Sequence, residues 1–137
     1  MYKLKGMLII VMVVFCFFVS LTTLYGFDEK QVQALKKTNK CPKCDLSGAK
    51  LNNLDMEYVD LSSANLSGAD LSNSMLGNAN LLKANLSGAN LSGTNLGFAV
   101  LLGADVSKAN LTNVFLDQAT WTNGKGCKIG SIGKCKQ

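Results

Sequence analysis

Histidine and arginine are both absent from the 137-residue sequence. Without histidine, the chain has neither a Ser-His-Asp nor a Cys-His catalytic arrangement, and it has no histidine-based metal site. Positive charge comes from 14 lysines, set against 9 acidic residues. Lysine supplies charge without the bidentate hydrogen bonding of arginine, so specific recognition of nucleic acid is not expected. These absences exclude most familiar enzyme mechanisms.

The N-terminal segment, residues 1–26, has the pattern of a targeting sequence. Lys3 and Lys5 precede an apolar stretch over residues 7–19, which gives way to weakly polar residues up to Gly26. A charged start, an apolar middle and a polar end are typical of a secretory signal. The alternative is an uncleaved anchor, because residues 7–24 are just long enough to span a bilayer. We expect export to the periplasm or the exterior, with membrane attachment only if residues 1–26 are retained.

Residues 44–123 form sixteen consecutive five-residue units without an insertion. Two examples are Ala64–Gly68 and Ala84–Gly88, which both read Ala-Asn-Leu-Ser-Gly. The third position of every unit is apolar, and the first position is alanine in ten of them. Apolar residues therefore recur at alternating gaps of two and three.

This spacing predicts a solenoid rather than a helix. Five residues rotate by about 500° around an α-helix, so apolar side chains with this spacing would spiral around it. A gap of two suits a short extended segment, and a gap of three suits a corner that restores the inward direction. Serine, glycine and asparagine at the fourth and fifth positions are residues that corners accept. We expect leucine and alanine to lie inside the solenoid.

These units resemble the pentapeptide-repeat family, whose motif is A-[DN]-L-x-x. The resemblance covers the whole of residues 44–123. It implies an all-β solenoid, namely a right-handed quadrilateral β-helix with four units per coil and about four coils. Six units lack alanine at the first position, and four of these recur at every fourth unit, beginning at Leu54, Ser74, Thr94 and Val114. That interval agrees with four units per coil.

Some members of this family imitate DNA and bind gyrase, which suggests one possible function. Such a role requires a cytoplasmic protein with a strongly acidic surface. Here residues 44–123 carry only seven acidic residues against three lysines, and the N-terminus has an export pattern. An inhibitor of a DNA-binding enzyme is therefore the least favoured function.

Both flanks of the repeat region are expected to act as caps. Residues 28–37 combine helix formers with acids at the start and lysines at the end, which complements the helix dipole. The chain then divides into a leader (1–26), an N-terminal cap with a helix (27–43), the β-helix (44–123) and a cysteine-containing tail (124–137).

Cys41, Cys44, Cys127 and Cys135 are expected to form disulfides in an oxidising compartment. If the caps lie at opposite ends of the rod, pairing within each cap is favoured, because bridged Cα atoms lie about 4.4–6.8 Å apart. The alternative is a thiol-disulfide protein that uses the C-x-x-C pair Cys41 and Cys44, although no βαβ pattern surrounds it. We expect no cofactor, and no four-cysteine zinc site, because the rod would keep the two pairs apart.

Arranging the five-residue units four to a coil gives two sides with polar outward residues and two with apolar ones. The apolar sides present Tyr58, Met75, Phe98 and Phe115, and then Leu82, Val100 and Leu102. Such a cluster is typical of a contact surface, although the helix or the tail of the same chain could cover it instead. The sequence therefore favours a non-catalytic structural or protein-interaction module whose partner is a second copy or another protein.

Overall fold

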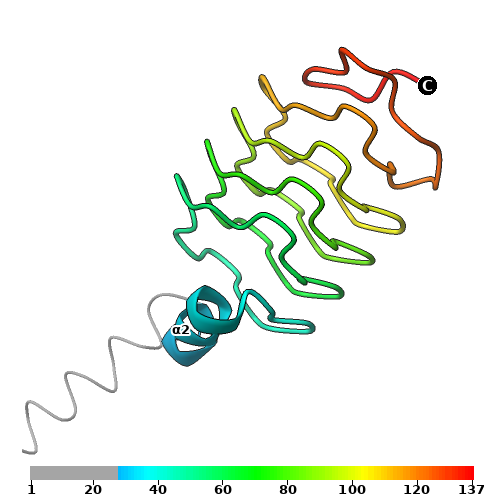
Figure 1. Ribbon diagram of the computed structural model, residues 1–137. Helices are drawn as coiled ribbons and strands as arrows, with labels where there is room; N and C mark the ends of the chain where they lie inside the picture. The colour runs from blue at the N-terminus through cyan, green and yellow to red at the C-terminus, as the bar shows by residue number, and fades with distance from the viewer. Residues whose placement is uncertain (1–27) are drawn as a thin grey trace, which may run out of the picture.

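The computed structural model describes residues 28–137 (Figure 1). The signal or anchor expected at residues 1–26 lies outside the described residues. One helix opens the described range, and coils then stack into a rod with the C-terminal tail at the end opposite the helix (Figure 1). Within residues 28–137, no helix is both long and apolar enough to cross a membrane.

Helix α2 spans Glu29–Thr38, one residue later at each end than the sequence predicts. Asp28 caps its N-terminus, because the Asp28 carboxylate accepts a hydrogen bond from a backbone N–H of the first turn at 2.9 Å. The helix ends at Asn39, which adopts a left-handed conformation. Val32 and Leu35 are buried in the hydrophobic core at the start of the rod, so α2 lies against the first coil.

Each coil consists of four five-residue units, because parallel β-bridges join each second-position residue to its equivalent four units later, such as Asn65 to Asn85. Backbone hydrogen bonds link neighbouring coils on both sides of each bridge. The Leu66 N–H donates to the Asn85 carbonyl at 2.7 Å, and the Asn85 N–H donates to the Ala64 carbonyl at 2.9 Å. Four units therefore complete one turn of the chain.

We number the four sides of the rod by the five-residue units that they contain. Units on side 1 begin at residues 44, 64, 84 and 104, and units on side 2 begin at 49, 69, 89 and 109. Units on side 3 begin at 54, 74, 94 and 114, and units on side 4 begin at 59, 79, 99 and 119. Equivalent positions on one side stack coil upon coil, so each side carries columns of side chains parallel to the rod axis.

The interior is filled by third-position leucines and first-position alanines. Third-position leucines from Leu46 to Leu101 are fully buried. On side 3, the first position instead carries Ser74 and Thr94, whose buried hydroxyls donate to backbone carbonyls of the preceding coil at 2.7 and 2.8 Å. Because these hydroxyls are paired, side 3 accommodates polar groups inside the core without an unsatisfied donor.

The fifth position forms the corner of each unit and adopts a left-handed conformation. Its φ is positive from Gly48, at 68°, to Gln118, at 57°. Glycine and asparagine adopt this conformation most readily, which explains their frequency there. Two aromatic residues occupy it nonetheless, Tyr58 and Phe98 on side 3, with φ of 59° and 60°.

The tail covers only half of the last coil, which comprises residues 104–123. Ile132 pairs with Phe115 and Gly126 pairs with Thr120, both through antiparallel bridges, so the tail lies over sides 3 and 4. Four backbone N–H groups on sides 1 and 2 of this last coil find no acceptor within residues 28–137, namely those of Val106, Lys108, Leu111 and Asn113. The two ends of the rod are therefore closed differently.

Candidate interaction surface

Exposed apolar side chains of the repeat region gather on sides 3 and 4. Tyr58 is 71% exposed and Phe98 is 55% exposed. We call the following six exposed residues the apolar surface: Tyr58, Met75, Phe98 and Phe115 on side 3, and Val100 and Leu102 on side 4. With α2 and the tail in place, these side chains remain between 38% and 71% exposed.

Two details differ from the sequence-based expectation. Leu82 is half-buried rather than exposed, because it lies in a middle coil with Leu102 next to it in the same column. Leu102 lies nearer the end of the rod and stays 44% exposed. The tail adds Ile129 and Ile132, at 73% and 51% exposure, which the sequence analysis did not identify. The tail has no repeat, so no periodicity there separates inward from outward residues.

Side 3 is hollowed by a trough of about 520 Å³ that runs along the rod axis. The fourth-position column of this side consists of Glu57, Gly77, Gly97 and Asp117, all of which line the trough. Second- and fifth-position side chains form its walls, and these include Met75, Phe98 and Phe115. The trough thus combines two carboxylates, a glycine floor and walls of mixed polarity, since Asn73, Asn78 and Asn95 line it beside the apolar residues.

The backbone conformation does not require the two floor glycines. Neither Gly77 nor Gly97 has a positive φ. A Cβ atom at Gly77 would lie 3.5 Å from Oε1 of Glu57, so the Glu57 side chain extends over this glycine. A Cβ atom at Gly97 would lie 3.2 Å from Oδ1 of Asn95. The absence of a side chain at Gly77 and Gly97 therefore gives room to the neighbouring Glu57 and Asn95 side chains and does not serve a special turn.

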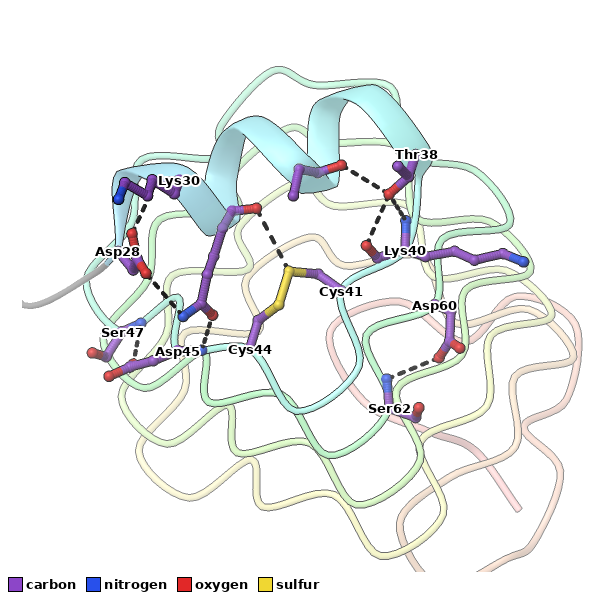
Figure 2. The surroundings of a disulfide bond; sticks show 12 residues. Asp28, Lys30, Thr38, Lys40, Cys41, Cys44, Asp45, Ser47, Asp60 and Ser62 are labelled. Atoms are coloured by element: carbon purple, nitrogen blue, oxygen red, sulfur yellow. Dashed lines mark hydrogen bonds between the residues drawn. A yellow bond between two sulfur atoms is a disulfide. The ribbon is translucent and has the colours of Figure 1, made fainter.

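The four cysteines within residues 28–137 form two disulfides, one near each end of this range. The Cα atoms are 5.4 Å apart in Cys41–Cys44 and 5.0 Å apart in Cys127–Cys135. Figure 2 shows Cys41 beneath α2, where its Sγ lies 3.5 Å from the carbonyl oxygen of Gln31. In the part of the chain that the structure describes, no group of three or more His, Cys, Asp or Glu side chains could hold a metal ion.

Sides 1 and 2 carry polar ladders instead of apolar residues. Asn65 donates from Nδ2 to Oδ1 of Asp45 at 3.0 Å on side 1. Asn90 donates in the same way to Asp70 at 3.1 Å on side 2. These second-position amides and carboxylates bond to one another along the rod, so the two sides offer a partner few unpaired polar groups.

Hydrogen bonds lower the pKa of three aspartates on these polar sides. The side chain and the backbone N–H of Ser47 lower the pKa of Asp45, and those of Ser72 do the same for Asp70. For Asp105, the backbone N–H two residues later makes the largest contribution to the lowered pKa. Each carboxylate is therefore favoured in its charged form in the folded protein.

Comparisons with known proteins agree with the coil geometry. The family model described as pentapeptide repeats (8 copies) matches the chain twice, over residues 44–81 and 79–118. A pentapeptide repeat protein from the thylakoid lumen of Arabidopsis thaliana is 31% identical, with a TM-score of 0.57, over 66% of this chain and 59% of that protein. A pentapeptide repeat protein from Nostoc PCC 7120 is 30% identical, with a TM-score of 0.41, over 64% and 78% of the two chains.

The chain thus matches less than two thirds of the length of the Arabidopsis protein. The search of curated proteins gave no match. Pentapeptide repeat proteins fold as right-handed quadrilateral β-helices, and the coil-to-coil bridges of this chain fit that architecture.

The lowered pKa values predict a loss of stability in acid. A carboxyl with a depressed folded-state pKa stabilises the fold above its unfolded value, and this contribution disappears as pH falls through the folded pKa. Urea unfolding between about pH 5 and pH 2 should therefore show a falling midpoint. A variant with Asp45→Asn, Asp70→Asn and Asp105→Asn keeps an acceptor at each position, so its midpoint should fall less. Equal slopes for the two proteins would contradict this account.

Proposed function

Because the chain belongs to the pentapeptide repeat family, whose members are generally non-enzymatic structural or interaction proteins, we propose that it is an exported, non-catalytic module that binds a protein partner through the apolar surface. The observation that carries this proposal is the confinement of the exposed large apolar side chains of the β-helix to two adjacent sides. The comparisons indicate no catalytic family.

The backbone conformation of two aromatic residues supports the proposal. Tyr58 and Phe98 occupy left-handed corner positions that glycine or asparagine would fill at lower cost. Both side chains are mostly exposed, so they gain little from burial in the folded monomer. Tyrosine, phenylalanine and methionine are enriched at protein interfaces. A partner that covers these rings would supply the stabilisation that the isolated rod does not give them.

In this proposal, the flanking segments act as caps that limit end-to-end association of rods. Residues 27–43 and 124–137 flank a β-helix of about four coils over residues 44–123. Burial of Val32 and Leu35 of α2 supports the N-terminal cap. The antiparallel bridges of the tail support the C-terminal one. With both ends at least partly closed, the sides become the main surfaces for contact.

Export is proposed from three observations. Residues 1–26 have the pattern of a signal peptide or a membrane anchor. Two disulfides suit an oxidising compartment. A similar pentapeptide repeat protein comes from the thylakoid lumen. Any membrane contact would then be made by residues 1–26, and DNA mimicry in the cytoplasm is the least favoured alternative.

The main alternative function is thiol-disulfide exchange by Cys41 and Cys44. Exchange requires a sulfur that an attacking thiolate can reach. Cys44 is only partly buried, whereas Cys41 is 3% exposed and lies against α2. Its position supports a structural disulfide that holds the cap on the first coil.

A structural role predicts that the Cys41–Cys44 bond resists mild reduction in the folded protein. Thiol labelling in a glutathione buffer should modify Cys41 and Cys44 only after denaturant is added. A variant with Cys41→Ser and Cys44→Ser should still fold, with a free energy of unfolding lower by about 2 kcal/mol for such a short loop. Reversible reduction of the folded protein by the same buffer would instead support thiol-disulfide exchange.

The interaction proposal is tested by photo-crosslinking in the cells that express the full chain. Phe98→p-benzoylphenylalanine and Leu102→p-benzoylphenylalanine place the probe on the apolar surface, and the same replacement of Ser67 and Ser92 places it on sides 1 and 2. We expect one discrete product from positions 98 and 102 and none from 67 and 92. A product of twice the chain mass identifies a second copy as the partner. Equal labelling from all four positions, or none from any, would exclude the proposal.

A further inference from the structure

Glycine and acidic residues at the fourth position occur only on side 3. On the other three sides, every fourth position holds serine, threonine, asparagine or leucine. On side 3 the column runs Glu57, Gly77, Gly97, Asp117. The trough described above therefore has a carboxylate at each end and two glycines as its floor.

Glu57 and Asp117 are the first and last members of this four-residue column, so their Cα atoms are separated by three coils. At the spacing of neighbouring strands, this corresponds to about 14 Å along the rod. The Glu57 side chain extends over Gly77, and its carboxylate accepts no hydrogen bond from any residue in the range 28–137. Asp117 is held in place because its Oδ1 accepts the N–H groups of Gly130 and Ser131, at 2.8 and 3.1 Å.

The chemistry of the trough favours an occupant with positive charge at both ends and an apolar centre. The terminal carboxylates attract cations, and the walls include Met75 and the rings of Phe98 and Phe115. Aromatic ring faces also attract ammonium groups. An anionic or wholly polar occupant would leave these groups without a partner.

The shape of the trough favours a segment of polypeptide over a small molecule. Sites for small ligands bury roughly 70–90% of the ligand surface, whereas this trough is open along its length. In an extended segment, residues i, i+2 and i+4 face the same way, and residues i and i+4 are about 13 Å apart. Lysines at i and i+4 would therefore lie beside the two ends of the column, within reach of the Glu57 and Asp117 carboxylates, with residue i+2 between them.

We propose that the trough binds an extended segment of a partner protein with the pattern Lys-x-Φ-x-Lys, where Φ is a large apolar residue. This inference rests on the proposed function, since it specifies the chemistry of the partner at the same surface. The segment belongs to a different protein, because the chain itself has one lysine pair at this spacing, Lys36 and Lys40, with Thr38 between them at the end of α2.

The test is a titration of the full, ¹⁵N-labelled chain in maltoside micelles with the peptide acetyl-Lys-Ser-Leu-Ser-Lys-amide. We expect chemical-shift changes at the amides of Gly77, Gly97 and Phe98. The double variant Glu57→Gln with Asp117→Asn should weaken binding about fivefold, because it removes two exposed ion pairs. The double variant Gly77→Ser with Gly97→Ser should abolish binding, since serine at the fourth position is standard elsewhere in the rod and fills the floor.

Matched controls separate the trough from the general charge of the protein. The double variant Asp45→Asn with Asp70→Asn removes the same charge from sides 1 and 2, where asparagine is common at the second position, and should bind like the wild type. A peptide with both lysines acetylated should bind at least about fivefold more weakly. Binding of the isomer acetyl-Lys-Lys-Ser-Leu-Ser-amide, in which the lysines are adjacent, should be weaker by a similar factor.

Three results would overturn the inference. These are equal binding of the adjacent-lysine peptide, equal weakening by the Asp45 and Asp70 control, and absence of shifts at Gly77 and Gly97 at about 5 mM peptide. If any of them occurs while position 102 still gives its discrete crosslink, the peptide pattern is wrong and the proposed function stands. If the crosslinks from Phe98 and Leu102 are also absent, both proposals fail.

Discussion

The hydrogen bonds that join one coil to the next, such as those from Leu66 to Asn85 and from Asn85 to Ala64, hold the chain to a strict period of four units. One inserted residue would move every following side chain out of its column, and residues 44–123 contain no insertion. The same bonds place leucine on leucine inside the rod. Because each coil is stabilised only by its neighbours, the ends need separate solutions. Helix α2 supplies one of them, and the disulfide-closed tail supplies the other.

The period that builds the core also organises the surface. A residue at one outward position recurs in a column, so a local choice of side chain becomes a property of a whole side. Sides 1 and 2 use this for ladders of hydrogen-bonded Asn and Asp, such as Asp45 and Asn65. Side 3 departs from the pattern inside, at Ser74 and Thr94, and outside, at the floor glycines. Side 3 also carries four of the six residues of the apolar surface, which is why we assign binding to it.

The sequence predicted the coil length and the inward residues, because both depend on a local pattern that repeats. It also predicted the helix to within one residue at each end, because helix formers and terminal charges are local signals. It did not predict the burial of Leu82, which depends on its neighbour Leu102 in the next coil. The trough was missed because its floor is defined by what is absent at Gly77 and Gly97. The pairing of the tail with the last coil follows from three-dimensional contacts that no repeat in the tail encodes.

Amide hydrogen exchange, residue by residue, tests the coil register most directly. In the middle coils, the third-position amides of Leu66 and Leu86 donate to the next coil, whereas the fourth-position amides of Ser67 and Ser87 are bonded only to an asparagine side chain. We predict slow exchange at the third position and a minimum of protection at the fourth position of each unit. Val106, on the open half of the last coil, should exchange fast. Equal protection at the third and fourth positions would contradict the coil-to-coil hydrogen bonds, and slow exchange at Val106 would contradict the four-unit coil.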